Sequence, residues 1–295
     1  MEPRETQVTS PVAPPVTLQV REYGDRSAST HLLLVHGFPD DQLMWEPLVE
    51  ALPSTWHVVT YDVRGSGRSD KPRGVASYAA DLLVEDLLAV LDATVPVDRR
   101  VHLLGHDWGA IMGWHVLAAE SWDPRLQGRV ATCTASSGMS LDHLGTLNQI
   151  WRGRLRMLPQ TLHSWYVWLF QVPWLSERLW RHGQPLLRRL ATRIDPTAAL
   201  LPWGAQVRAN ASGGLNLYRA IVLPRLRHPV AWRTSVPVQL VVATRDPWVT
   251  PRSLEGMEAR CRDLTRVEVD EGHWVPRARP VELAALVTEF VRRHP

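Results

Sequence analysis

Cysteine and lysine are both scarce in this chain. It has two cysteines among 295 residues, and Lys71 is its one lysine, so nearly all of its positive charge is arginine. Cys133 and Cys261 lie far apart in the sequence, and two isolated cysteines form no disulfide framework. This usage fits a reducing cytoplasm, where we expect the protein. The net charge is only +3, from residues scattered along the chain, which does not indicate nucleic-acid binding.

Long hydrophobic runs are also lacking. A helix that crosses a bilayer needs about 20 consecutive apolar residues, and no uninterrupted apolar stretch approaches that length. Residues 1–14 are charged and then proline-rich, and no apolar segment of a secretion signal follows them, so we expect a flexible tail there. The remaining length, with 45% hydrophobic residues in the chain, suits one large α/β domain that carries an inserted lid.

Short apolar runs alternate with helical patterns along most of the sequence. Continuous runs such as Val238–Ala243 are typical of strands covered on both faces of a mostly parallel sheet. The middle of the chain breaks this alternation, because it is rich in Trp, Leu and Arg and has no convincing strand. We therefore predict an α/β core formed by residues 15–137 and 228–295. Residues 138–227 are predicted to form a helical lid over the carboxyl ends of the strands.

A serine is missing where a strand–turn–helix pattern of this kind usually carries one. The apolar run Val101–Leu104 leads into GHDWG at residues 105–109, and a helical pattern with small residues follows. This is the context of a nucleophile elbow, in which a tight turn lifts one side chain above the sheet. The side chain here is that of Asp107. A carboxylate forms an alkyl-ester intermediate and cannot form the acyl-enzyme of a serine esterase, so the substrate class is already narrowed.

Two more polar residues follow predicted strands further along the chain. Asp246 comes shortly after Val238–Ala243, and His273 comes after the next strand. The order nucleophile, acid, histidine, with each residue at the same edge of the sheet, is that of a hydrolase triad. We expect His273 to be the general base for a nucleophilic Asp107, and Asp246 to orient it. Asp142 follows an earlier predicted strand and is the rival acid.

The motif HGFP at residues 36–39 follows another apolar strand. Its glycine allows the backbone to approach the site closely, so the N–H groups of Phe38 and Trp108 are predicted to form an oxyanion hole. His36 is expected to brace its loop and not to take part in chemistry. The later run DVRGSGRS at residues 62–69 lacks the GK[ST] ending and the dinucleotide spacing, and is therefore not interpreted as a phosphate loop.

Together these motifs resemble the α/β-hydrolase superfamily and, within it, the epoxide hydrolases. The resemblance covers residues 16–295 and rests on HGFPD, the DxRGxGxS run, GHDWG, the loop of Asp246, and EGHW ending at Trp274. It implies the α/β-hydrolase fold with an inserted cap, and an enzyme that opens an apolar epoxide to a vicinal diol. Metal and organic cofactor are both unnecessary for such a reaction.

The resemblance also implies two lid tyrosines that hydrogen-bond the epoxide oxygen. The chain has five tyrosines, and Tyr166 and Tyr218 are the two within the predicted lid. The Asp107 carboxylate would attack an epoxide carbon while both phenols stabilise the alkoxide. Water activated by His273 would then hydrolyse the ester. Three tryptophans are expected to contact the substrate: Trp108, Trp165 and Trp274.

Other functions remain open at this point. A haloalkane dehalogenase also uses an elbow Asp followed by Trp, but such proteins usually carry Asn where Phe38 stands and need no lid tyrosines. A non-catalytic binding protein with this fold would usually lack a triad member, and none is missing. The expected partners are a small lipophilic epoxide and water, without nucleic acid. A homodimer is left open, and docking of the Trp- and Arg-rich lid on a membrane is considered but not favoured.

Overall fold

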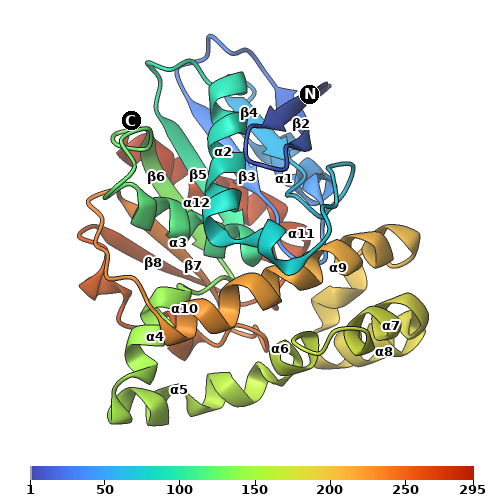
Figure 1. The fold of residues 1–295 in the computed structure, drawn as a ribbon. Coiled ribbons are helices and arrows are strands. Elements are labelled where there is room, and N and C mark those ends of the chain that lie inside the picture. Colours follow the sequence, from blue (N-terminus) through green and yellow to red (C-terminus); the bar gives the residue numbers. More distant parts are fainter. Residues whose placement is uncertain (1) are drawn as a thin grey trace.

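The computed structural model describes residues 2–295, and its centre is an eight-stranded sheet (Figure 1). The strands lie side by side in the order β1-β2-β4-β3-β5-β6-β7-β8. The pairs β1–β2 and β2–β4 are antiparallel, and every other pair in the sheet is parallel. This arrangement confirms the predicted α/β fold. The strands are β1 (Arg4–Ser10), β2 (Val16–Tyr23), β3 (His31–Val35), β4 (His57–Tyr61), β5 (Val101–His106), β6 (Val130–Ser136), β7 (Val238–Ala243) and β8 (Leu264–Val269).

Helices cover both faces of the sheet, which explains why β3 to β7 are rich in apolar residues and buried along their whole length. On one face, α1 (Glu46–Ala51) and α12 (Pro280–Arg293) pack together over one apolar cluster. On the other face, α2 (Ala80–Thr94) and α3 (Trp108–Ala119) pack over a second, larger cluster. The short α11 (Val275–Ala278) precedes α12. Because these helices hold the sheet from both sides, the carboxyl ends of its parallel strands are left free for a site.

The prediction of a flexible tail over residues 1–14 is wrong for most of that segment. Arg4–Ser10 is β1, which pairs along its length with Val16–Tyr23 and forms the edge of the sheet. Most of its side chains are polar and exposed, so the segment lacks the apolar alternation by which a strand is recognised. Its pairing comes instead from backbone hydrogen bonds to a neighbour that the local pattern does not reveal.

A helical insertion separates β6 from β7 and lies along the lower edge of the molecule in Figure 1. In the described chain it contributes no strand to the sheet, and some of its apolar side chains, among them Met157, Phe170 and Trp180, join the cluster under α2 and α3. Its helices are α4 (Leu141–Asn148), α5 (Trp151–His163), α6 (Trp165–Phe170), α7 (Leu175–His182), α8 (Gln184–Ile194), α9 (Ala205–Leu217) and α10 (Leu223–Arg227). The insertion lies across the carboxyl ends of the parallel strands, beside which ligands bind in folds of this class.

Two adjacent glycines position α9 against the core. A Cβ on Gly213 would lie 2.0 Å from the carbonyl oxygen of Gly65, and a Cβ on Gly214 would lie 2.7 Å from the ring of Phe38. Without these Cβ atoms the helix comes into direct contact with two loops at the sheet edge. Just after α9 the backbone widens into a π-helical turn, Tyr218–Val222, a local feature that often occurs at functional sites.

We predict that Gly213→Ala lowers the free energy of unfolding by about 1–3 kcal/mol, because the new methyl group must displace the backbone at Gly65. Helix propensity alone would favour alanine by about 0.8–1.0 kcal/mol, so the sign of the change tests the contact. Urea unfolding followed by circular dichroism measures it. Ser212→Ala, at the neighbouring exposed position of α9, is the control and should be nearly neutral. A stabilised Gly213→Ala protein would contradict this packing.

Candidate active site

Asp107 occupies a strained turn between β5 and α3. Its backbone angles are φ 52° and ψ −116°, a region that residues with a side chain rarely adopt. The turn is possible because its neighbours are small: a Cβ on Gly109 would lie 1.9 Å from the carbonyl oxygen of Val35. This geometry is that of a nucleophile elbow, and it presents the carboxylate above the carboxyl end of the sheet.

The two carboxylate oxygens of Asp107 have different surroundings. Oδ1 accepts a hydrogen bond from the backbone N–H of Phe38 at 2.7 Å. Oδ2 lies 3.7 Å from Nε2 of His273. The close approach of the Phe38 loop depends on Gly37, where a Cβ would lie 2.4 Å from Oδ1. One oxygen is therefore held by a backbone amide, while the other faces the histidine.

Burial raises the pKa of Asp107 to about 6, although nearby His273 and the backbone amides of Phe38 and Trp108 act in the opposite direction. The carboxylate is therefore largely ionised at neutral pH and becomes protonated in mild acid. An ionised but poorly solvated carboxylate is a stronger nucleophile than one exposed to water, because fewer hydrogen bonds must be broken before it reacts.

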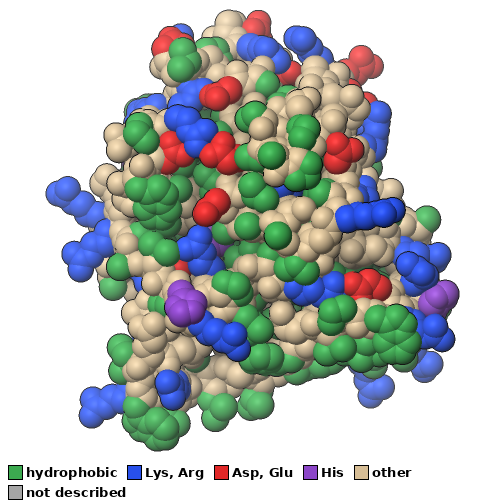
Figure 2. Space-filling view, in the orientation of Figure 1, with side chains coloured by type: hydrophobic (Ala, Val, Ile, Leu, Met, Phe, Trp, Pro, Cys, Tyr) green, Lys and Arg blue, Asp and Glu red, His purple; other side chains and the backbone are tan. Residues whose placement is uncertain are grey.

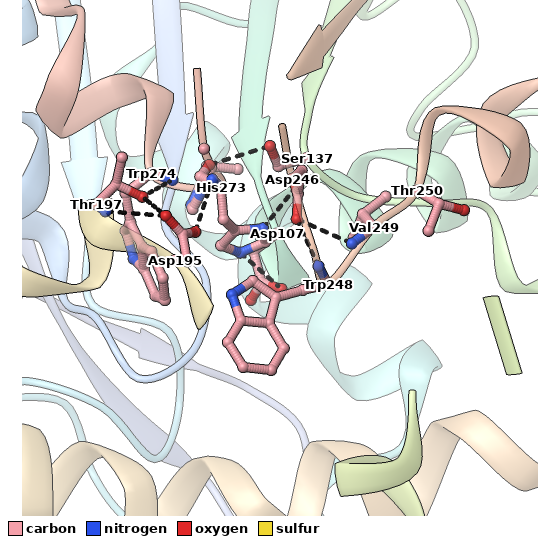
Figure 3. A network of polar contacts seen from close by, with 12 residues as sticks. Asp107, Ser137, Asp195, Thr197, Asp246, Trp248, Val249, Thr250, His273 and Trp274 are labelled. Atoms are coloured by element: carbon pink, nitrogen blue, oxygen red, sulfur yellow. Dashed lines mark hydrogen bonds and ion pairs between the residues drawn. The ribbon is translucent and has the colours of Figure 1, made fainter. Parts of the chain in front are cut away.

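His273 and Asp246 form a direct pair. Nδ1 of His273 lies 2.8 Å from Oδ2 of Asp246, and the other oxygen of this carboxylate accepts the backbone N–H groups of Trp248 and Val249 (Figure 3). The loops after β7 and β8 bring the pair together. Asp142 is not part of this arrangement: it accepts the N–H of Val230 and lies 4.0 Å from His115.

Burial by itself would lower the pKa of His273, but the charges of Asp246 and Asp107, with the hydrogen bond to Asp246, raise it to about 9. In the free protein the imidazole is therefore positively charged at neutral pH and lies between two carboxylates. Removing the charge of Asp107 would lower this pKa, since that charge is one of its causes.

The backbone N–H and the backbone carbonyl of His273 both have hydrogen-bond partners, and the sequence did not reveal these contacts. Its N–H donates to Oδ2 of Asp195 at 2.9 Å (Figure 3). Its carbonyl oxygen accepts from the Ser137 hydroxyl at 3.1 Å and lies 3.0 Å from Nε2 of His106. In the sequence, Asp195 precedes Pro and Thr and has the pattern of an ordinary helix N-cap, a role that it also has here.

Asp195 is a buried carboxylate of the helical insertion that touches the His273 loop. Its Oδ1 accepts the backbone N–H and the hydroxyl of Thr197, and a Cβ on Gly272 would lie 2.3 Å from the same oxygen. The glycine before His273 is therefore needed for this contact. The charge of Asp195 also raises the pKa of His273, so the insertion influences the histidine electrostatically as well as by position.

Tyr166 and Tyr218 lie above the carboxylate, on α6 and at the start of the π-helical turn. Their ring centroids are 6.3 Å apart, and the ring of Tyr218 lies 4.8 Å from that of Trp108. Burial raises the pKa of both phenols above its usual value, and the charge of Asp107 raises it further. Both groups therefore stay protonated, as hydrogen-bond donors, across the range in which Asp107 ionises.

Two cavities, of about 330 Å³ and about 260 Å³, meet at this point. Three residues line both of them: Asp107, Tyr166 and Tyr218. The larger cavity also touches Trp108, and the smaller touches His273, Trp165 and Trp274. Among residues 2–295, no cluster of three or more His, Cys, Asp or Glu side chains has the arrangement of a metal site, and no helix is both long and apolar enough to cross a membrane.

Two other residues singled out by the sequence have structural contacts. Trp274 is almost fully buried, and its indole N–H donates to Oδ2 of Asp40 at 2.9 Å, which links the HGFPD and EGHW motifs. Nε2 of His36 accepts the N–H of Val63 at 2.9 Å, so its Nδ1 carries the proton and donates to the carbonyl oxygen of Gly37. His36 thus braces the loop that carries Phe38.

The sequence and the fold of this chain are similar to those of known proteins. A sequence profile described as alpha/beta hydrolase fold matches residues 30–276. The chain is 31% identical over 306 residues to a Mycobacterium tuberculosis protein named "Probable oxidoreductase EphD", and the match covers 93% of this chain and 48% of that protein. It is 29% identical over 319 residues to "Epoxide hydrolase A" of the same organism, with 94% of each chain covered. The chain thus spans about half the length of the first relative.

A solved structure is also similar. The crystal structure of a Bacillus megaterium epoxide hydrolase in complex with an inhibitor superimposes with a TM-score of 0.78 at 23% sequence identity. The match covers 98% of this chain and 100% of that one. At such an identity the similarity shows the fold alone.

We predict that Asp195→Asn lowers the pKa of His273 below about 9, because a buried negative charge close to the imidazolium is removed. Asparagine keeps an oxygen that can accept the His273 N–H, so the loop should stay in place. An NMR titration of the imidazole in the substrate-free protein measures the shift. Asp270→Asn is the control: this carboxylate is 82% exposed and screened by water, and its loss should leave the titration unchanged. An unaltered pKa in Asp195→Asn would contradict the proposed coupling.

Proposed function

The chain belongs to the alpha/beta hydrolase fold family, and we propose that it is an epoxide hydrolase that works through a covalent ester on Asp107. The name of the first mycobacterial relative describes a protein about twice as long, so the word oxidoreductase refers to that whole protein. A relative of nearly equal length, which is covered almost end to end, is named an epoxide hydrolase.

The observation that carries the proposal is the junction of the two cavities. Asp107, Tyr166 and Tyr218 are the residues common to both linings. Opening an epoxide requires a nucleophile on one side of a three-membered ring and hydrogen-bond donors at its oxygen on the other. The junction supplies a carboxylate and two protonated phenols. The two cavities offer separate space for the substituents on the two epoxide carbons.

In the first half-reaction, Oδ2 of Asp107 attacks an epoxide carbon. A carbon–oxygen bond of the ring breaks as the ester bond forms, and the released oxygen becomes an alkoxide that accepts hydrogen bonds from Tyr166 and Tyr218. Their raised pKa keeps both phenols protonated, so they can act as donors. Oδ1 remains against the N–H of Phe38 and becomes the carbonyl oxygen of the ester.

In the second half-reaction, His273 removes a proton from water, which attacks the ester carbonyl carbon. The charge that develops on Oδ1 is stabilised by the backbone amides of Phe38 and Trp108. The tetrahedral intermediate then collapses as the ester carbon–oxygen bond breaks. The released oxygen takes the proton of the new carboxylic acid and completes the diol, and the Asp107 carboxylate is regenerated. Ester formation has already neutralised Asp107, which lowers the pKa of His273 from about 9. The imidazolium gives its proton, through solvent, to the alkoxide, which becomes the first hydroxyl of the diol. The neutral imidazole is then available as the base that deprotonates water. Asp246 holds its orientation and stabilises the imidazolium.

The cavity linings favour a lipophilic substrate. The smaller cavity is lined mainly by Trp, Phe and Leu side chains of the insertion, among them Phe170, Trp180 and Leu187. The larger one adds a few polar groups, such as Asn148 and Gln160, to a mainly apolar wall. An epoxide with an apolar substituent in the smaller cavity fits this arrangement best.

We predict that His273→Gln, incubated with a panel of small and bulky epoxides, accumulates a covalent adduct on the peptide that contains Asp107. The substitution removes the base for the second step and leaves the nucleophile in place. Mass spectrometry of the digested protein detects the adduct, and gas chromatography detects the diol formed by the unchanged enzyme. Asp107→Asn should give neither product and serves as the control.

Other outcomes would contradict the proposal. The absence of both diol and adduct with every epoxide would reject it. Halide released from haloalkanes without diol from epoxides would indicate a dehalogenase. Full activity after Asp107→Ala would show that this carboxylate is not the nucleophile.

We also predict an acidic limb in the pH profile of kcat/KM near pH 6. Asp107 must be ionised to attack, and it becomes protonated as the pH falls through its pKa of about 6. Below that value the rate should fall about tenfold per pH unit. Initial diol formation between mildly acidic and neutral pH measures this, and Asp270→Asn provides a control profile. A flat profile across this range would contradict the assigned nucleophile.

A further inference from the structure

The outer side of α5 carries an exposed apolar stripe. Trp151, Leu155, Leu158 and Leu162 are 71%, 55%, 53% and 66% exposed. Their spacing of four, three and four residues places them on one side of the helix. None of the four lines either cavity of the site. Apolar side chains of this size along one side of a helix are normally buried. An exposed stripe of them indicates a surface that binds another molecule.

The stripe continues along the insertion. Three further tryptophans, Trp165, Trp168 and Trp174, are at least half exposed, and Leu186, Leu190 and Ile194 repeat every four residues on α8. Together with the stripe on α5, these side chains form what we call the lid face. It consists of Trp151, Leu155, Leu158, Leu162, Trp165, Trp168, Trp174, Leu186, Leu190 and Ile194. In Figure 1, α5, α6 and α8 lie along the same lower edge of the molecule.

Positive charge is concentrated in the insertion that carries this face, so the scattered distribution expected from the sequence is wrong. Residues 151–227 contain 12 arginines and two acidic residues, a formal charge of +10, whereas the whole chain has +3 and the rest therefore −7. Glu177 is paired with Arg219, and Asp195 is buried against the His273 loop. Figure 2 shows basic side chains interleaved with apolar ones along the lower edge, over α5 to α8.

We propose that the lid face docks on the surface of an anionic phospholipid bilayer. A helix that combines an exposed apolar stripe with arginines lies in the plane of such an interface. The tryptophans and leucines would enter the boundary between headgroups and acyl chains, and the arginines would reach the phosphates. Arg188, Arg189 and Arg193 on α8 are exposed, and no acidic partner among the described residues forms an ion pair with them.

A second copy of the chain fits this face less well. In a twofold contact the same surface meets itself, so arginines would face arginines. Such like-charge contacts oppose association unless acidic groups separate them, and the two acidic residues of the segment are already engaged. An anionic lipid surface supplies the missing negative charge, and its hydrocarbon can cover the apolar side chains.

The smaller cavity of the site lies directly behind the lid face. Trp165, Leu186, Leu190 and Ile194 line this cavity and are also 54%, 55%, 46% and 46% exposed. A lipophilic molecule dissolved in the bilayer could thus reach the cavity, and Asp107 at its inner end, without crossing bulk water. This route for an epoxide rests on the proposed function, whereas docking itself does not depend on it.

Co-sedimentation with two kinds of vesicle tests the docking. We expect the unchanged protein to bind vesicles made of equal parts phosphatidylcholine and phosphatidylglycerol, to bind pure phosphatidylcholine much more weakly, and to be released by salt. The triple variant Leu155→Ser, Leu158→Ser and Leu162→Ser should bind the anionic vesicles on the order of 100-fold more weakly. Arg188→Gln, Arg189→Gln and Arg193→Gln together should weaken that binding by roughly tenfold or more.

A matched control removes exposed apolar side chains from the α/β domain, outside the insertion. Val97→Ser and Val281→Ser change residues that are 87% and 71% exposed and lie away from the insertion, so vesicle binding should not change. The leucine variant should turn over a water-soluble epoxide at the normal rate, which separates a failure of docking from a failure of the proposed function. Binding that is absent, equal on both vesicle types, or retained by the leucine variant would overturn the proposal. So would a dimer in solution that the leucine variant dissociates.

Discussion

The structure of the site depends on one short contact, the hydrogen bond from the backbone N–H of Phe38 to Oδ1 of Asp107. It requires Gly37, and it fixes which carboxylate oxygen faces His273. The side chain of the same Phe38 points to the insertion, where its ring packs against Tyr218 and beneath Gly214. A single residue therefore joins the elbow to the lid: its amide donates to the Asp107 carboxylate, and its ring sets how closely α9 can approach.

The charge state of His273 is likewise set by a few neighbouring groups. Three carboxylates influence one buried imidazole: Asp107 and Asp246 by direct approach, and Asp195 through the backbone N–H of His273. In the free protein they keep the imidazole protonated, and its positive charge offsets the negative charge of Asp107. In the proposed cycle, esterification removes one of the three charges. The histidine then becomes a base only after the covalent intermediate exists, when a base is needed.

The helical insertion contributes residues to the site on its inner side and carries the lid face on its outer side. Its inner side contributes Tyr166, Tyr218 and Asp195, which contact the cavities or the histidine loop. Its outer side carries the apolar and basic groups of the lid face. Because Trp165, Leu186 and Ile194 belong to both sides, a partner bound outside would lie within a side chain's length of the smaller cavity. Access to the site and association of the lid face are therefore physically linked.

The sequence alone determined the features that local patterns encode. The elbow at Asp107, the order of Asp246 and His273, and the buried parallel strands follow from turn chemistry and apolar runs within a few residues. Tertiary structure decided what depends on residues far apart in the chain. The pairing of Arg4–Ser10 at the sheet edge was missed because its side chains are polar and its partner supplies the hydrogen bonds. Asp195 carries no local signal of its bond to His273, because that bond spans 78 positions of the sequence. The meeting of two cavities at three residues likewise has no local signature, since only folding brings those side chains together.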